Sequence, residues 1–365
     1  MRRIRLRSGI LYELLKYAVA ILAVMVLGIF LIRLQGQDVR AAGWALVYGA
    51  FGNMTRIGNT VRWITPCLLT GISAAVAFRA GIWNMGIGGQ LYMGAFAATM
   101  VALYCPMPAP IYPFVCMLVG GIFGLLWATI PALLKRYLNV SEMITTLMLN
   151  YVATLLTTYL TKAVNQVSSS NNSKAVATPL INEDAQLTNL IPKTNASTGV
   201  FVAIIIVLVV YFAYRYMVVG YEMRMVGSNI RFAKAGGVKT NVIFMSIFMV
   251  SGFVAGLAGA IEILGVYGKF TADFSSNMGW DGIMIATIAM YDPLATGFVG
   301  ILWAAIKAGS LYMEATTETN RLTVEIIQSA FVLFVTINYF SLLHNRFRRF
   351  QKARQIRRED GQNAS

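Results

Sequence analysis

Aromatic rings and side-chain amides lie close together at three points of this sequence. Each pair combines one flat ring with one amide within four residues: Trp83 with Asn84, Tyr151 with Asn150, and Trp280 with Asn277. A flat ring stacks on another ring, and an amide both donates and accepts hydrogen bonds. This combination suits a nucleobase joined to a ribose. Aromatic residues near the ends of membrane spans also form interfacial belts, so both interpretations stay open.

Two of these amides, Asn84 and Asn277, begin a repeated motif. Residues 84–89 and 277–282 both read Asn-Met-Gly-x-x-Gly, and each opens an apolar stretch. Such a repeat predicts an inverted pair of halves, whose broken helices line a route near the middle of the bilayer. The topology given below places the two copies at opposite membrane faces. Because the chain holds 19 Met and 32 Gly, a chance match is the alternative.

Several kinds of chemistry lack the residues they need. His344 is the only histidine, and Cys67, Cys105 and Cys116 have no paired spacing. A disulfide framework, a zinc site and a Ser-His-Asp triad therefore find no support. Residues 236–240 come nearest to a phosphate-binding loop, but they lack the adjacent Gly-Lys-Ser/Thr. We expect no metal site, no catalytic residue and no ATP hydrolysis in this chain.

The composition is that of a membrane protein. Apolar residues make up 57% of the chain and charged residues 12%, against about 25% charged in an ordinary soluble domain. A span needs about 20 mostly apolar residues. We predict ten spans, at 17–34, 60–78, 86–104, 110–134, 143–161, 199–219, 242–265, 282–291, 294–312 and 323–343. The eighth is too short to cross a bilayer, so we expect a half-helix broken at Asp292-Pro293.

Basic residues orient these spans. With the N-terminus inside, 20 of the 30 Lys and Arg fall on the inner side, 9 on the outer side, and Lys307 within a span. This sorting explains the net charge of +15 without nucleic acid. The map gives a basic cytoplasmic N-terminus (1–16), a transmembrane domain (17–343) and a basic cytoplasmic tail (344–365). Both ends are expected to lie against anionic lipid.

Polar side chains inside spans are costly to expose to lipid, so they face cavities or other helices. The set comprises Glu142, Asn150, Glu262, Asp281, Lys307, Glu325 and Gln328. We expect Glu262 and Lys307 to form an ion pair between helices. Gly252, Gly256 and Gly259 predict close helix packing. So little buried charge favours an uncharged solute.

Two polar loops interrupt the spans. Residues 162–198 are predicted to be external, either as a solvated loop that touches an extracytoplasmic partner or as flexible filler. Residues 220–241 are predicted to be cytoplasmic. There Ser228 or Asn229 is expected to cap a short helix that ends at a glycine pair. Such a helix suits a groove in a cytoplasmic partner, and a plain basic loop is the alternative.

The chain resembles the permease subunit of ATP-binding-cassette (ABC) importers, in the branch for nucleosides and simple sugars, which is related to branched-chain amino-acid permeases. The resemblance rests on residues 80–90, 141–151, 224–237, 251–262 and 279–283. It implies an all-α polytopic fold with about ten transmembrane helices, broken helices and a cytoplasmic coupling helix. Residues 88–90 read Gly-Gly-Gln where relatives commonly have Gly-Glu-Gln, and Lys234 and residues 236–238 also depart from the usual pattern.

The resemblance also implies roles and partners. Coupling to the ATPase is expected at Arg224, Gly227, Ser228, Asn229, Phe232, Lys234 and Gly236. The substrate route is expected at Trp83, Asn84, Gln90, Asn150, Tyr151, Glu262, Asn277, Trp280 and Asp281. Expected partners are a second permease, a cytoplasmic ATPase that holds ATP and magnesium, and an extracytoplasmic binding lipoprotein, at a bacterial plasma membrane.

The resulting hypothesis is an importer permease for nucleosides, with simple sugars as the alternative cargo. Two further classes stay open. One is a secondary transporter that uses Glu262, Asp281 or Glu325 as ion ligands, and the other is a membrane scaffold that transports nothing. Uptake that depends on a partner ATPase would exclude the secondary transporter. Loss of uptake after changes in the 220–241 loop would exclude the scaffold.

Overall fold

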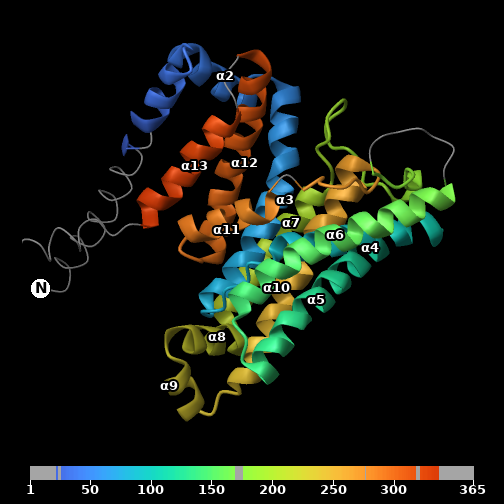
Figure 1. Ribbon diagram of the computed structural model, residues 1–365, viewed down its shortest axis with the longest axis vertical. Helices are drawn as coiled ribbons and strands as arrows, with labels where there is room; N and C mark the ends of the chain where they lie inside the picture. The colour runs from blue at the N-terminus through green and yellow to red at the C-terminus, as the bar shows by residue number, and fades with distance from the viewer. Residues whose placement is uncertain (1–21, 24–25, 169–175, 276, 318–320, 337–365) are drawn as a thin grey trace, which may run out of the picture. The chain divides into compact units, whose positions relative to one another are not determined.

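The computed structural model describes residues 22–23, 26–168, 176–275, 277–317 and 321–336. The regular structure of these parts is helical, apart from isolated bridges such as Ala177 to Thr271, and irregular connections join the helices (Figure 1). The chain divides into one unit of residues 40–318 and another of residues 1–39 with 319–365. In the second unit, residues 26–34 are helical, α13 spans Arg321–Thr336, and the Gln35 amide donates to Thr323 Oγ1 at 2.6 Å.

Among the described residues, seven helices are long and apolar enough to cross a membrane. They are α3 (Met54–Arg79), α4 (Ile87–Tyr104), α5 (Tyr112–Leu138), α6 (Glu142–Ser168), α7 (Gly199–Tyr216), α10 (Thr240–Glu262, continued by the π-helical turn η2, Ile263–Tyr267) and α12 (Pro293–Thr316). Each matches a predicted span. The predicted spans 17–34 and 323–343, like the two termini, lie partly or wholly outside the described residues.

The eighth predicted span is a half-helix, as expected. Helix α11 (Met278–Ile288) has 11 residues, and the chain turns through Met290 and Tyr291, both with positive φ, before α12. Asp292 accepts hydrogen bonds from the amides of Leu294 and Ala295, each at 3.1 Å, and so caps α12. Pro293 occupies the first turn, where a missing amide hydrogen costs nothing.

Helices α4, α5 and α10 form a tightly packed core. A methyl group on Gly256 would overlap the Gly120 carbonyl and lie 2.8 Å from the Gly124 Cα. A methyl group on Gly259 would lie 3.0 Å from the Ala95 amide nitrogen. The predicted close packing at Gly252, Gly256 and Gly259 is confirmed, because only glycine lets these backbones approach so closely.

Part of the polar stretch 162–198, which was predicted as an external solvated loop or flexible filler, packs on the protein. Helix α6 includes the first residues of this stretch, and residues 176–198 lie beside the end of α10 and η2 (Figure 1). The amides of Thr178 and Ile181 donate to the carbonyls of Phe270 and Gly268, and the Leu187 amide donates to Leu264. These main-chain bonds hold the segment against the connection between η2 and α11.

The short helix predicted after Ser228 is present. Helix α9 (Ile230–Ala235) is capped by Asn229, whose side chain accepts from the amides of Arg231 and Phe232. Gly237 then takes a φ of 82°, which favours glycine. Two further helices were not predicted: α2 (Val39–Phe51), and α8 (Val218–Ser228), which leads into α9.

Candidate functional site

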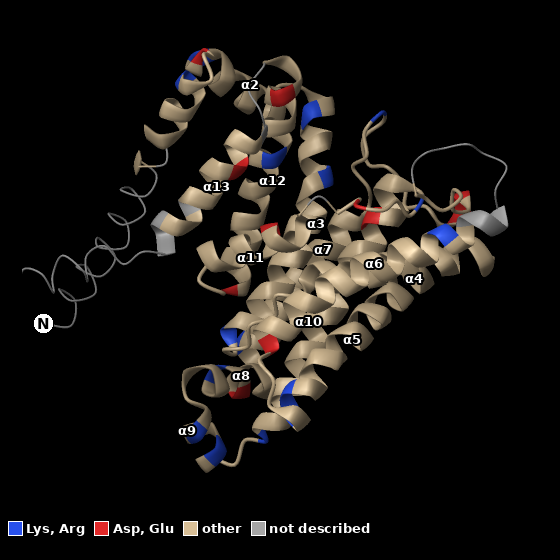
Figure 2. Ribbon diagram, in the orientation of Figure 1, with Lys and Arg blue, Asp and Glu red and all other residues tan. Residues whose placement is uncertain are grey.

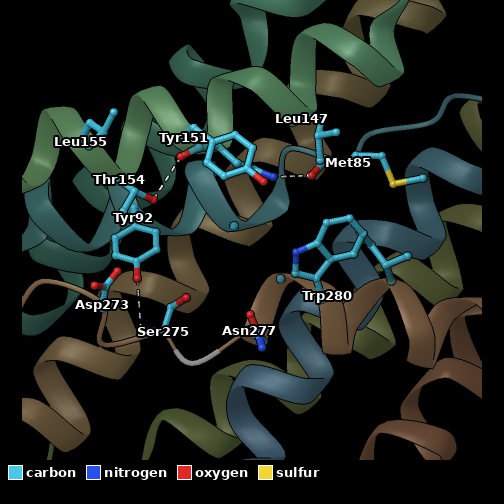
Figure 3. A pocket seen from close by; sticks show the side chains of 14 residues that line it. Met85, Tyr92, Leu147, Tyr151, Thr154, Leu155, Asp273, Ser275, Asn277 and Trp280 are labelled. Carbon is cyan, nitrogen blue, oxygen red and sulfur yellow. Dashed lines mark hydrogen bonds between the residues drawn. The ribbon is translucent and has the colours of Figure 1, made fainter. Parts of the chain in front are cut away.

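A cavity of about 560 Å³ lies between α4, α6, α11 and the connection that precedes α11. Four predicted route residues line it: Asn150, Tyr151, Asn277 and Trp280. Figure 3 shows the Tyr151 and Trp280 rings on opposite sides of this space, one from α6 and one from α11. Tyr151 is 64% exposed and Trp280 44%, so neither ring is covered by the described residues.

The two copies of the repeated motif meet at this cavity. A methyl group on Gly279 would lie 2.6 Å from the Gly88 amide nitrogen, so the first turns of α4 and α11 are in contact. The prediction that the copies lie at opposite membrane faces is therefore wrong. Each copy of the motif starts a helix, and the two helices begin at one shared point.

From that point the two helices run to different ends of the larger unit. Helix α11 ends beside the end of α3, where Tyr291 packs on Phe78 and the Met290 carbonyl accepts from Arg79. The end of α3 also touches the α8–α9 turn, because a methyl group on Gly81 would lie 3.8 Å from the Gly227 Cα and one on Gly227 would lie 3.1 Å from the Ala80 Cα. Helix α4 ends near residues 176–198. There the Tyr112 hydroxyl donates to Ala102 and accepts from Asn182 at 3.1 Å.

Buried amides build the turn that starts α4. The Asn84 side chain accepts from the Gly86 amide at 3.0 Å, donates to Ser251 Oγ at 2.8 Å, and exchanges hydrogen bonds with Gln90 at 3.1 Å. Asn84 is 0% exposed and Gln90 1%, so neither lines the cavity. Asn150 does line it, while binding the Gly89 amide and the Met85 carbonyl, both at 2.7 Å.

Trp83 lies apart from the other two predicted rings. It packs on Phe78 with ring centroids 5.0 Å apart and does not line the cavity. The three rings singled out in the sequence therefore divide into one facing pair and one separate ring.

Polar groups that the sequence did not single out form one end of the cavity. Tyr92, Asp273 and Ser275 line it, and Figure 3 shows them grouped away from Trp280. The Tyr92 hydroxyl accepts from the Ser275 amide at 3.5 Å, and its ring packs on Phe274 at 5.1 Å. Asp273 has a φ of 58°, a left-handed conformation that Asp and Asn adopt more readily than most residues. No hydropathy pattern marks such residues in a connection.

Behind α11 lies a buried charged cluster. Glu262 binds Arg62 at 2.8 Å, and Asp281 binds Lys307 and accepts from Trp303 Nε1. The predicted pair between Glu262 and Lys307 is wrong, since each side chain binds another partner. Isolated buried charges are costly, so opposite charges lie together.

The ring of Trp63 connects the two ion pairs. The Arg62 guanidinium lies 3.7 Å from its centroid and the Lys307 ammonium 4.6 Å, both within cation–π range. Arg62 also donates to the Tyr267 hydroxyl at 3.3 Å. The cluster thus holds both ends of the connection between η2 and α11, whose residues form one cavity wall.

The predicted coupling residues surround the α8–α9 turn. Gly227 packs on Arg79 and Ala80, Arg224 donates to the Tyr214 carbonyl, and Ser228 donates to Met225. The outer face of α9 is open, with Phe232 65% exposed and Lys234 and Gly236 also exposed. Figure 2 shows basic residues gathered on α9. Nearby, Lys135 and Glu142 form an ion pair at 3.0 Å.

The described parts of the chain contain no group of three or more His, Cys, Asp or Glu side chains placed to hold a metal ion. The larger unit thus presents the cavity lined by Tyr151 and Trp280 and, at one end, the exposed helix α9.

Comparison with known families decides the class of protein. Residues 56–337 match the family described as branched-chain amino acid transport system / permease component. The chain belongs to this family. It is thus a multi-pass ABC transporter permease and is not the subunit that hydrolyses ATP.

Relatives of this permease transport more than one kind of solute, by their names. The guanosine ABC transporter permease NupP of Bacillus subtilis is 30% identical over 90% of this chain and 94% of its own length. The glucose permease TsgB13 of Haloferax volcanii is 29% identical over 87% and 85%. The nucleoside permease NupB of Lactococcus lactis is 25% identical over 80% and 82%.

Proposed function

We propose that this permease forms the translocation route of a nucleoside importer, with the cavity between Tyr151 and Trp280 as the place where the solute passes. The observation that carries the proposal is the pair of facing rings beside the amides of Asn150 and Asn277. Rings of this kind stack on any nucleobase, and the amides bind its polar edge. The guanosine and nucleoside relatives support this choice of cargo.

The arrangement of α4 and α11 supports an inverted repeat. Two copies of one motif start two helices from a shared point, and the helices lead to different ends of the unit. At the start of α4 the Gly86 and Gly89 amides already bind Asn84 and Asn150, so the helix offers the solute the positive end of its dipole and no fixed charge. In this proposal, Asn84, Gln90, Glu262 and Asp281 hold the route in shape from behind. Trp83 lies outside the cavity, near the end that carries α9.

Helix α9 is proposed to dock in the ATPase and transmit its motion. Its apolar and basic outer face, with Phe232 and Lys234, is suited to a groove in a soluble partner. The further partners are a second permease, in a heterodimer, and an extracytoplasmic binding lipoprotein. We place the permease in a bacterial plasma membrane with both termini in the cytoplasm.

Simple sugars are the second candidate cargo, favoured by the glucose relative. Aromatic faces and hydroxyl-binding groups also suit a sugar ring. An ion-coupled mechanism finds less support, because Glu262 and Asp281 already bind Arg62 and Lys307.

Uptake by reconstituted vesicles tests the proposal. The permease pair, its ATPase and its binding protein are placed in proteoliposomes, and radiolabelled guanosine uptake is measured with and without ATP. We expect uptake only with ATP and with the ATPase. Uptake by this chain alone under an ion gradient would refute the ABC mechanism, and competition by glucose but not by nucleosides would assign the cargo to sugars.

A variant in α9 tests the coupling role. Phe232→Asp is expected to abolish solute-stimulated ATP hydrolysis, while Phe232→Tyr retains most of it. Phe232 is exposed, so the change leaves the fold intact. This position is a better choice than Gly227, where a side chain would strike the end of α3. Normal coupling in Phe232→Asp would contradict docking through this face.

A further inference from the structure

Asp273 is the single charged side chain among the residues that line the cavity. Its carboxylate makes no hydrogen bond or ion pair with any residue that the structure describes, whereas Glu262 and Asp281 are paired. Asp273 is exposed to the cavity side, next to the hydroxyl of Tyr92 and to Ser275 (Figure 3). A free acceptor therefore faces the space that the solute would occupy.

A carboxylate only accepts hydrogen bonds, and its two oxygens match a pair of donors. Two neighbouring hydroxyl groups supply such a pair, and hydrogen bonds to a charged acceptor are the strong ones. The Tyr92 hydroxyl beside it both donates and accepts, so it can complete the pattern around a polyhydroxyl ring. The other end of the cavity, with Tyr151 and Trp280, offers a stacking surface instead of hydrogen-bonding groups.

We propose that Asp273, with Tyr92 beside it, reads the vicinal hydroxyl pair of the solute's sugar, and so selects ribonucleosides over nucleosides that lack those hydroxyls. The facing rings of Tyr151 and Trp280 hold the base, and the sugar then lies toward the polar end (Figure 3). This inference rests on the proposed function. It also applies to a simple sugar, which carries the same hydroxyl pair.

The test compares two solutes in one reconstituted complex. ATP-driven uptake of guanosine and of 2′,3′-dideoxyguanosine is measured for the wild type, Asp273→Asn and Glu314→Gln. The binding protein is the same throughout, so its own preference cancels when the variants are compared. Glu314 is an exposed acid on α12 outside the cavity, which makes its variant a matched loss of one carboxylate.

We expect the preference for guanosine to fall about tenfold in Asp273→Asn and to stay unchanged in Glu314→Gln, since a hydrogen bond to a charged group contributes about this much. An unchanged preference in Asp273→Asn would overturn the inference while leaving the proposed function standing. Absence of ATP-driven uptake of any nucleoside or sugar by the wild type would overturn both.

A third solute separates the sugar from the base. Guanine also carries two neighbouring donors, and inosine lacks one of them. If Asp273→Asn alters the preference between guanosine and inosine, but not that between guanosine and its dideoxy analogue, the carboxylate reads the base edge and the inference is wrong. Asparagine adopts the left-handed backbone that Asp273 requires, so the variant is expected to fold.

Discussion

Two adjacent residues at the start of α11, Trp280 and Asp281, face different surroundings. Trp280 lines the cavity, whereas Asp281 binds Lys307 and Trp303 behind the helix. Helix α11 packs closely on its neighbours, since a methyl group on Gly282 would lie 2.5 Å from the Thr70 carbonyl carbon of α3. The largely buried Asp281–Lys307 pair fixes α11 one residue away from the Trp280 ring. The charged cluster therefore helps to hold the cavity wall in place.

Removing the Trp280 ring is expected to weaken transport through the loss of stacking. A base stacked on an aromatic side chain gains about 1–3 kcal/mol, so Trp280→Ala should raise the solute concentration for half-maximal uptake about tenfold. Trp280→Phe should retain most of the effect because it keeps a flat face. Trp44→Ala, at an exposed position on α2, is the matched control. Equal uptake by Trp280→Ala and wild type would show that the ring does not meet the solute.

Breaking the Asp281–Lys307 pair is expected to destabilise the permease. Asp281→Leu removes the acid that Lys307 binds in a largely buried place, at a cost of about 3 kcal/mol. Adding Lys307→Met to Asp281→Leu should recover most of this loss, since an apolar pair needs no charge compensation. The melting temperature of the purified complex measures both. A double variant no more stable than the single one would contradict the pairing argument.

At the scale of helices, the sequence predicted the spans that hydropathy controls. Seven predicted spans match helices, since a stretch of about 20 apolar residues has few alternatives in a bilayer. The break at Asp292-Pro293 and a cap at Ser228 or Asn229, of which Asn229 is the one used, were also predicted, because both depend on local chemistry. Helix α2 was missed, since its 13 residues are too few for a span.

Features built from long-range contacts were not predictable in this way. The main-chain bonds between residues 176–198 and the end of α10 carry no side-chain signature. The exchange of ion-pair partners, Glu262 with Arg62 and Lys307 with Asp281, depends on how four helices come together. For the same reason Asp273 and Ser275, in a connection without regular structure, went unnoticed, whereas the rings of Tyr151 and Trp280 were found by type.

Because α10 packs closely on α5, the substitutions Gly256→Ala and Gly43→Ala are expected to have different effects on stability. Gly256→Ala places a methyl group against the backbone of Gly120 and Gly124, which cannot move aside as a side chain would. We expect a loss of about 1–3 kcal/mol, seen as a lower melting temperature. Gly43→Ala, with nothing within 4 Å of its added methyl, is the matched control and should be neutral or slightly stabilising. Equal effects at both positions would contradict the packing.

At the scale of the molecule, the larger unit has two functional ends joined through its centre. Residues 176–198 close one end by bonding to the chain that leads into the cavity wall, and α8 with α9 forms the other beside the end of α3. Helices α4 and α11 start together between them. In the proposed importer, a movement of α9 would pass to the end of α3 through its contact with Gly227, and from there to α11 through the packing of Tyr291 on Phe78.

This arrangement predicts which side of the membrane each end faces. Cys105 is exposed at the end of α4, whereas Cys67 and Cys116 are buried, so a membrane-impermeant maleimide should label Cys105 alone in right-side-out vesicles. In a Cys105→Ser background the reagent should label nothing, and Ser228→Cys at the α8–α9 turn should react only after the membrane is permeabilised. The basic residues of the α9 end favour this orientation, because Lys and Arg are enriched in cytoplasmic loops. Labelling of both positions from the same side would remove the basis for two halves of opposite orientation and for docking of an ATPase on α9.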